Sequence, residues 1–293
     1  MGSWPNLAEL VKARAGTAPV GLLGAPLAAG SVTPSAYDLA PGVLRATLRR
    51  IGRYDVETGR ELRTKVADRG DVDVAGLAIE AATAPISAAV RESTEAHALS
   101  LLVGGHNAIT RPALLGLGGS LDEIGLITLD AHFDMRDTKD GLSNGNPVRA
   151  LLEDGLPGAN IAQVGLASFA NSEAMHKDAV EAGNLVVTMG DVRRDGIEQA
   201  ITRAIDHVAH CDALVIDCDI DVIDRSQMPG APGARPGGMA VADFFAAVRR
   251  LASDPRVRVI DLVEWDPSLD ATDLSALTAA RWVAECLGGY ELR

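Results

Sequence analysis

Short apolar runs alternate along the chain with longer segments in which apolar residues recur every three or four positions. The runs expected to form strands are Val20–Gly24, Leu101–Gly104, Gly125–Leu129, Ile161–Leu166, Leu185–Met189, Leu214–Asp217 and Val257–Val263. The segments expected to form helices are Leu77–Ala98, Ile197–Val208, Val241–Ala252 and Leu274–Leu287. Because several of the runs are apolar on both faces, helices are expected to cover both sides of the sheet. The pattern predicts an α/β protein of three layers, αβα, with a mostly parallel central sheet.

No linker divides the chain. Clusters of Gly and Pro at Ala25–Pro41, Gly116–Gly119 and Pro229–Gly238 are typical of loops, so residues 1–293 are expected to form a single domain. The glycine motifs GxGxxG and GxxxxGK[ST] are missing after the predicted strands, which argues against a dinucleotide-binding or P-loop protein.

Composition and charge narrow the range of partners. The chain is 47% apolar and 23% charged, which excludes a disordered protein, and its net charge is −13. An acidic chain without a basic cluster argues against a nucleic-acid or membrane partner. Cys211, Cys218 and Cys286 are scattered and lack CxxC spacing, which is typical of a protein in a reducing compartment. We therefore expect a cytoplasmic location.

Three of the predicted strands run into residues that can ligate metals. The three segments are Leu101–Asn107 with His106, Leu126–Asp134 with Asp130, His132 and Asp134, and Leu214–Asp221 with Asp219 and Asp221. Ligands of parallel sheets bind at the carboxyl ends of strands. Since alternate side chains of a strand share a face, Asp130, His132 and Asp134 are expected to converge. The three segments together place four carboxylates and two imidazoles in one crevice.

The mutual repulsion of these carboxylates points to bound cations. Two unit charges about 4 Å apart repel by roughly 4 kcal/mol at an effective dielectric constant near 20, so four ionised carboxylates cannot share an empty crevice. Two divalent cations would balance them. Ligation by oxygen and nitrogen without thiolate favours Mn²⁺, with Zn²⁺, Fe²⁺, Co²⁺ and Ni²⁺ as alternatives. Such a pair can activate a shared water to attack an electrophilic carbon.

Each segment taken singly has an ordinary explanation. The DxHxD segment can be a solvated loop, the DxDxD segment a turn or a Ca²⁺ loop, and the histidine of GGH an unremarkable side chain. The Ca²⁺ loop is excluded because Val222 and Met228 occupy the positions that require Gly and Glu, counted from Asp217. The occurrence of all three segments at strand ends favours the metal centre.

These segments resemble those of the ureohydrolase family, which includes arginase, agmatinase and formimidoylglutamase. The family carries GGxH, DAHxD and SxDxDxxDP elements and a later Glu near a Pro. The counterparts in this chain are Gly104–His106, Asp130–Asp134, Asp217–Asp224, and Glu264 with Pro267. The order and spacing agree over roughly residues 20–290. The resemblance implies an arginase-like fold and one ureohydrolase-like catalytic domain over residues 1–293.

The resemblance is strongest to formimidoylglutamase, whose members tend to show GGGHE, DAHFDLR and SSGTPFR. This chain reads VGGHN, DAHFDMR and SNGNPVR at Val103–Asn107, Asp130–Arg136 and Ser143–Arg149. The resemblance implies hydrolysis of N-formimidoyl-L-glutamate to L-glutamate and formamide, a step of histidine degradation. It also implies two Mn²⁺ ions per subunit, a small amidine as the partner molecule, and a homo-oligomer, either a trimer or a hexamer.

Roles for individual residues follow from the resemblance. The expected metal ligands are His106, Asp130, His132, Asp134, Asp219 and Asp221. A hydroxide that bridges the metals is expected to attack the formimidoyl carbon, with Asp134 returning a proton to the leaving amine. Glu264 is expected to pair with the amidinium nitrogen. Asn144 and Arg149 are expected to bind the polar tail of the substrate, and Arg136 and Arg235 are further candidates.

Four residues depart from the family pattern. An ungapped match to the agmatinase form GGDHSIT would make Asn107 the ligand, whereas the formimidoylglutamase pattern favours His106, which we prefer. Asp217 replaces the usual Ser, Arg225 replaces a Pro, and Asn144 stands where arginases carry His. These departures keep two alternatives open. One is a ureohydrolase that releases urea from agmatine or a guanidino acid, and the other is a non-catalytic metal-binding relative.

Overall fold

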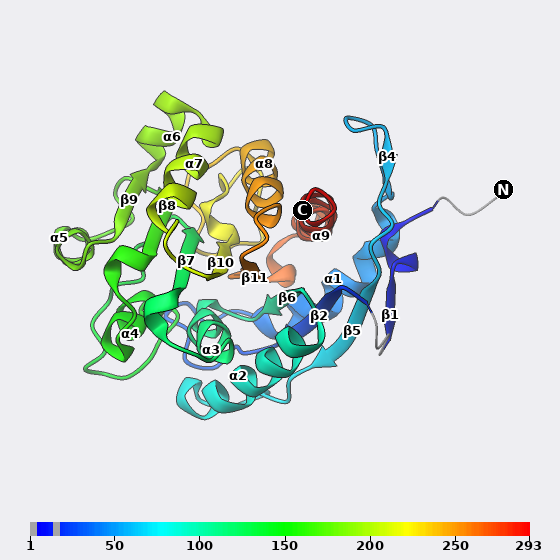
Figure 1. Ribbon diagram of the computed structural model, residues 1–293. Helices are drawn as coiled ribbons and strands as arrows, with labels where there is room; N and C mark the ends of the chain where they lie inside the picture. The colour runs from blue at the N-terminus through cyan, green and yellow to red at the C-terminus, as the bar shows by residue number, and fades with distance from the viewer. Residues whose placement is uncertain (1–4, 14–17) are drawn as a thin grey trace.

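A parallel sheet of nine strands forms the centre of the computed structural model, which describes residues 5–13 and 18–293 (Figure 1). Its strands in chain order are β1 (Val11–Ala13), β2 (Val20–Ala25), β5 (Val66–Asp71), β6 (Leu99–Gly104), β7 (Ile124–Leu129), β8 (Ile161–Leu166), β9 (Leu185–Thr188), β10 (Ala213–Asp219) and β11 (Val257–Val263). Their order across the sheet is β1-β5-β2-β6-β11-β10-β7-β8-β9. The predicted parallel sheet is confirmed.

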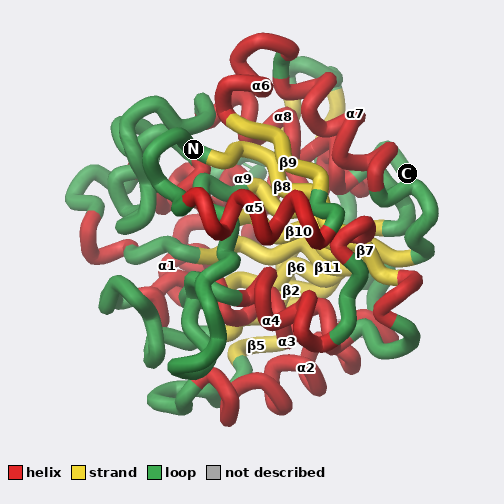
Figure 2. Tube along the Cα trace, turned by 90° about the vertical axis from the view of Figure 1, so that its left-hand side faces the viewer, coloured by secondary structure: helices red, strands yellow, loops and turns green. Residues whose placement is uncertain are grey.

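Helices cover both faces of this sheet, as Figures 1 and 2 show. The helices are α1 (Ala40–Thr47), α2 (Ile79–Ala96), α3 (Thr110–Gly116), α4 (Pro147–Asp154), α5 (Glu173–Ala182), α6 (Met189–Asp195), α7 (Ile197–His207), α8 (Val241–Ala252) and α9 (Leu274–Tyr290). One apolar core joins the sheet to α1 and α6–α9, and a second joins it to α2–α5. The three-layer αβα architecture is therefore confirmed. None of the described helices is both long and apolar enough to cross a membrane.

Local sequence explains where several helices begin and end. Pro147 lies in the first turn of α4, where its missing N–H is harmless, and Gly155 ends that helix in a left-handed conformation. The Ser172 hydroxyl accepts a hydrogen bond from the Met175 N–H and caps α5. Thr188 caps α6 in the same way, which ends β9 at Thr188 rather than at the predicted Met189.

Some elements were not predicted. Strand β5 runs from buried Val66 into the exposed residues Arg69, Gly70 and Asp71, so it lacks a continuous apolar signal. The two-residue strands β3 (Tyr54–Asp55) and β4 (Arg60–Glu61) form a small antiparallel hairpin. Both are too short for a periodic pattern to be recognised.

The strand order brings the predicted chemistry together. Strands β6, β11, β10 and β7 are consecutive neighbours in the sheet, and all four are parallel. Their carboxyl ends therefore lie at one edge, where the segments carrying the metal-ligating side chains begin.

Candidate active site

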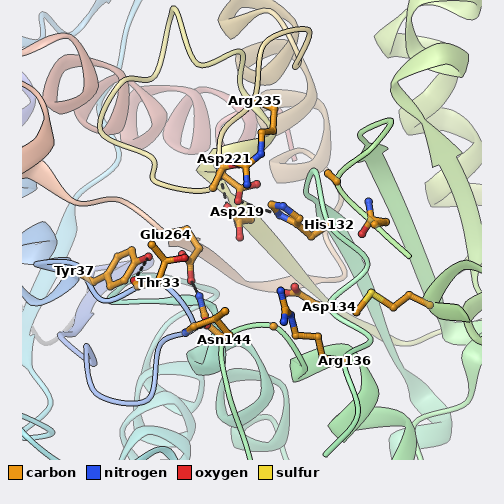
Figure 3. A pocket seen from close by; sticks show the side chains of 16 residues that line it. Thr33, Tyr37, His132, Asp134, Arg136, Asn144, Asp219, Asp221, Arg235 and Glu264 are labelled. Atoms are coloured by element: carbon orange, nitrogen blue, oxygen red, sulfur yellow. Dashed lines mark hydrogen bonds and ion pairs between the residues drawn. The ribbon is translucent and has the colours of Figure 1, made fainter. Parts of the chain in front are cut away.

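A cleft opens at the carboxyl edge of the central strands (Figure 3). Most of its polar lining comes from loops that follow β7, β10 and β11 and from the segment after β2. The polar side chains that line it are Thr33, Tyr37, His132, Asp134, Arg136, Asn144, Asn171, Asp219, Asp221, Arg235 and Glu264. The structure thus gathers residues from most of the predicted segments in one place.

The segment from Asp130 to Asp134 is a loop, because β7 ends at Leu129. These side chains do come together, but the predicted cause, the alternation of side chains along a strand, is wrong. The loop is shaped instead by hydrogen bonds: Asp130 Oδ1 accepts from the His132 N–H at 2.7 Å, and Asn171 bonds the backbone of Phe133 and Ala131. Asp134 has a positive φ of 52°. Asp134 and His132 both reach the cleft by this route.

Asp130, His132 and Asp221 form a compact group of potential metal ligands. One ligand atom from each lies within 4.8 Å of the others. His132 Nδ1 is 3.1 Å from Asp221 Oδ2 and 3.5 Å from Asp130 Oδ1. The negative charge of Asp221 raises the pKa of His132 to about 12, and burial raises the pKa of Asp130 to about 6. The protonated His132 ring therefore places a positive charge beside Asp130 and Asp221, where a metal cation could also bind.

Asp134 and Asp219 form a second part of the cluster with Asn107. The Asn107 Nδ2 group makes a short hydrogen bond to Asp134 Oδ2 and lies 3.5 Å from Asp219 Oδ2. Burial, together with repulsion from neighbouring carboxylates, raises the pKa of both acids well above its usual range. Asp219 Oδ1 also accepts from the Asp221 N–H at 2.9 Å, which fixes these two acids relative to each other.

The structure does not bring His106 to these carboxylates. Its Nε2 lies 2.8 Å from the Ala29 carbonyl oxygen, and its Nδ1 accepts from the Ala108 N–H at 3.3 Å. Both ring nitrogens are therefore engaged by backbone. The cause is the close packing of this segment on the loop after β2, where a Cβ on Gly105 would lie 1.9 Å from the Leu27 carbonyl oxygen. The geometry corrects our preference for His106, because Asn107 takes the position beside the acids.

Glu264 lies on the other side of the cleft, where it is held by amide donors. Its Oε1 accepts from the Asn107 N–H and from Asn144 Nδ2, both at 2.8 Å. Burial raises the pKa of Glu264 to about 7. Asn144 Oδ1 in turn accepts from the Val32 N–H at 2.7 Å. Glu264 and Asn144, which were predicted separately as contacts of the amidinium group and of the polar tail of the substrate, thus lie against each other.

Tyr37 is a lining residue that the sequence did not reveal. Its hydroxyl donates to the Thr33 carbonyl oxygen at 3.1 Å, and burial beside Glu264 raises its pKa. Tyr37 lies in the segment after β2 that was predicted only as a loop, and no motif marks it. Its position is set by tertiary contacts, including edge-to-face packing on the His106 ring with centroids 6.0 Å apart.

Of the three arginines proposed to bind substrate, two line the cleft and one does not. Arg149 points from α4 towards Asp178 of α5, with which it forms an ion pair, and it does not line the cleft. Arg136 and Arg235 do line it, on opposite sides of the acids in Figure 3. No carboxylate of the described residues lies within ion-pair distance of either. The expectation that Arg149 binds substrate is therefore not supported by its placement. Arg225 holds its own loop through the Ala231 carbonyl oxygen.

Asp217 is buried beneath the site rather than in it. It pairs in register with Asp261 of β11, and the two carboxyl groups interact with each other inside the sheet. Burial and repulsion from Asp261 raise its pKa well above the usual range. Asp217 therefore adds no side chain to the cleft lining.

We expect Asp217→Asn to stabilise the protein at neutral pH. A raised pKa in the folded state means that stability falls as pH rises above the unfolded value of about 3.9. The side-chain amide introduced by the substitution does not titrate. The increase in the free energy of unfolding should therefore be present at neutral pH and absent at acidic pH. Urea unfolding at the two pH values measures the change. An equal shift at both pH values would contradict this origin.

Comparison with known proteins decides the family. The model of the Arginase family matches residues 18–288. The chain belongs to the arginase family. It is 33% identical over 275 residues to a formimidoylglutamase of Halalkalibacterium halodurans, covering 92% of this chain and 86% of that protein.

Solved structures of the family share the fold. The crystal structure of formimidoylglutamase from Bacillus subtilis superposes with a TM-score of 0.92 at 30% identity, covering 99% of this chain and 92% of that one. A Trypanosoma cruzi formiminoglutamase structure with Mn²⁺ has a TM-score of 0.90 at 22% identity, covering 99% of both chains. The predicted family and its arginase-like fold are confirmed. As a family member, the chain is a hydrolase of carbon–nitrogen bonds in linear amidines.

Proposed function

We propose that this protein hydrolyses N-formimidoyl-L-glutamate to L-glutamate and formamide at a centre for two Mn²⁺ ions. The observation that carries the proposal is the cleft itself, in which a buried acidic cluster lies between Arg136 and Arg235, two arginines that have no carboxylate partner among the described residues. The similarity to curated formimidoylglutamases supports the same substrate.

The donor set suits divalent cations. Asp130, His132, Asp134, Asp219 and Asp221 would hold the pair, and we infer that Asn107 stands where His106 was expected. The raised pKa values of Asp130, Asp134 and His132 favour the protonated side chains, and bound cations would have to displace those protons. Oxygen and nitrogen donors without thiolate suit Mn²⁺ best, and other divalent metals remain alternatives. When bound, the metals would supply an activated water and stabilise developing negative charge.

We assign proton transfer and orientation of the substrate to three residues of the cleft. Asp134 lines the cleft, and a bound cation would replace its proton, so we assign its carboxylate the proton that the attacking water loses and the leaving amine gains. The oxygen of water joins the formimidoyl carbon, the bond from that carbon to the glutamate nitrogen breaks, and the amine leaves protonated. Glu264 would orient the amidinium group, with Asn144 fixing the carboxylate of Glu264.

The two arginines favour an acidic substrate. Formimidoylglutamate carries two carboxylates beyond its reactive amidine, whereas agmatine carries a second cation. Because no carboxylate in the part of the chain that the structure describes lies within ion-pair distance of Arg136 or Arg235, they are available to bind a carboxylate of the substrate. A cationic tail would be repelled by both side chains.

We expect Arg136→Gln to raise KM at least tenfold and to lower kcat less, because the change removes a charge that binds the tail of the substrate. Arg149→Gln is the matched control, since Arg149 pairs with Asp178 outside the cleft. Its KM should stay near the parental value. Steady-state assays of formamide release measure both variants. A larger rise in KM for Arg149→Gln would refute the assignment.

Product identification decides among the candidate functions. The Mn²⁺-loaded protein is incubated separately with formimidoylglutamate, agmatine and guanidinobutyrate, and the products are separated. Formamide from the first supports the proposal. Urea from either guanidine compound would establish the alternative ureohydrolase. Bound Mn²⁺ without product from any of the three would favour a non-catalytic relative.

We also propose that residues 1–293 act as one catalytic domain, because all the described strands except β3 and β4 share one sheet. A cytoplasmic location is proposed from the cysteines, since Cys211, Cys218 and Cys286 are all buried and unpaired.

The family resemblance suggests a trimer or a hexamer, which light scattering of the purified protein would test.

A further inference from the structure

We propose that Thr110 is a positioning residue that sets the orientation of the Asn107 amide and thereby the affinity for Mn²⁺. This inference rests on the proposed metal centre. Thr110 is the first residue of α3, is 1% exposed, and does not line the cleft. It therefore acts on the centre only through Asn107.

The Thr110 hydroxyl lies between two oxygen atoms. Its Oγ1 is 2.7 Å from Asn107 Oδ1 and 3.1 Å from Asp261 Oδ2. The other oxygen of Asp261 accepts from the Cys218 N–H at 3.2 Å, which anchors that carboxyl group to β10. Asn107 thus spans the distance from the acidic cluster on one side to Thr110 on the other.

Asn107 directs its nitrogen, and not its oxygen, at the acidic cluster. Its Nδ2 group faces the carboxylates of Asp134 and Asp219, and its Oδ1 accepts from Thr110. A cation between those carboxylates needs a lone pair from Asn107, which only Oδ1 supplies. Metal ligation by Asn107 therefore requires the amide to turn by half a rotation, which exchanges its oxygen and nitrogen without changing its shape.

A hydroxyl is the group that serves both orientations. After the turn, Asn107 Nδ2 faces Thr110 and must donate, so Thr110 Oγ1 becomes the acceptor and directs its own proton to Asp261 Oδ2. The Asn107 N–H that faces Thr110 and the Thr110 hydroxyl then both have acceptors. Without the hydroxyl, the metal-binding orientation would leave a buried N–H without an acceptor and remove a donor from Asp261, and both losses are costly in a buried site.

Manganese titration of Thr110 variants tests the inference without substrate. Free Mn²⁺ is followed by electron paramagnetic resonance as metal is added to the metal-free protein. Thr110→Val keeps the shape and removes the hydroxyl, and it should weaken the binding of one Mn²⁺ about 10- to 100-fold. Thr110→Ser keeps the hydroxyl and should bind close to parental affinity. Equal weakening by both variants would overturn the hydroxyl's role.

A double-mutant cycle separates positioning from general damage. If Thr110 acts through Asn107, then Thr110→Val should not weaken Mn²⁺ binding further in an Asn107→Ala background. A full additional loss there would overturn the inference. Binding of two Mn²⁺ to Thr110→Val as tightly as to the parent would also overturn the role of Thr110. That result would leave the proposed metal centre intact. A parental protein that binds no Mn²⁺ would instead overturn the metal centre and this role together.

Discussion

Turnover is expected to fall by several orders of magnitude in Asp134→Asn, with the fold retained. The substitution preserves the shape of the side chain but removes its ability to exchange a proton at neutral pH. Asp134 lines the cleft, is 7% exposed, and accepts a short hydrogen bond from the Asn107 side-chain amide. The substitution would therefore remove both the proposed proton carrier and one negative charge of the proposed metal centre. The rate of formamide release per Mn²⁺-loaded subunit measures the effect.

Asp217→Asn supplies the control for this result. Asp217 is also a buried aspartate with a raised pKa near the carboxyl edge of the sheet, but it does not line the cleft. The same chemical change there should leave kcat within a few-fold of the parent. Near-parental turnover in Asp134→Asn, or an equal collapse in both variants, would show that Asp134 is not the proton carrier.

Manganese binding is expected to weaken steeply as the pH falls. In the metal-free protein, burial keeps protons on Asp134 and Asp219 well above their usual pKa, and His132 stays protonated up to about pH 12. A cation must displace these protons, because each ligand binds through a deprotonated atom. The apparent Kd should therefore rise more than tenfold for each unit of pH lost, since more than one proton is released.

Calorimetry can count the released protons. Titration with Mn²⁺ in two buffers of different ionisation enthalpy gives their number, and thermal unfolding gives the linked stability. The increase in Tm caused by Mn²⁺ should be larger at mildly alkaline than at mildly acidic pH, because tighter binding to the folded state stabilises it more. Exhaustive chelation should abolish turnover and Mn²⁺ should restore it. A Kd that does not change with pH, or full activity after chelation, would contradict the dinuclear centre.

The central strands were predictable because their burial is nearly uniform. Strands β8 and β11 have the bounds that the apolar pattern predicts. Strand β5 was missed because only its first residues are buried. Periodicity therefore locates strands that have helices on both sides, and it loses those that run to the surface.

The candidate site was predictable in composition but not in detail. The acids and His132 converge, although Asp130–Asp134 is a loop whose form depends on the distant Asn171. The choice between His106 and Asn107 depends on backbone packing against Leu27 and Ala29, which a local motif does not contain. A one-residue ambiguity of this kind is settled only by the tertiary fold.

The backbone at two of the acids has a consequence for how this enzyme could change. Asp134 and Glu264 have φ angles of 52° and 61°, in the left-handed region that side chains avoid and glycine tolerates. Each such residue costs on the order of 1–3 kcal/mol of folding free energy. Selection for thermal robustness alone would favour glycine at both positions and would delete the two carboxylates to which we assign the proton transfer and the substrate contact. At these two positions, a substitution that increases thermal stability would therefore be expected to reduce activity.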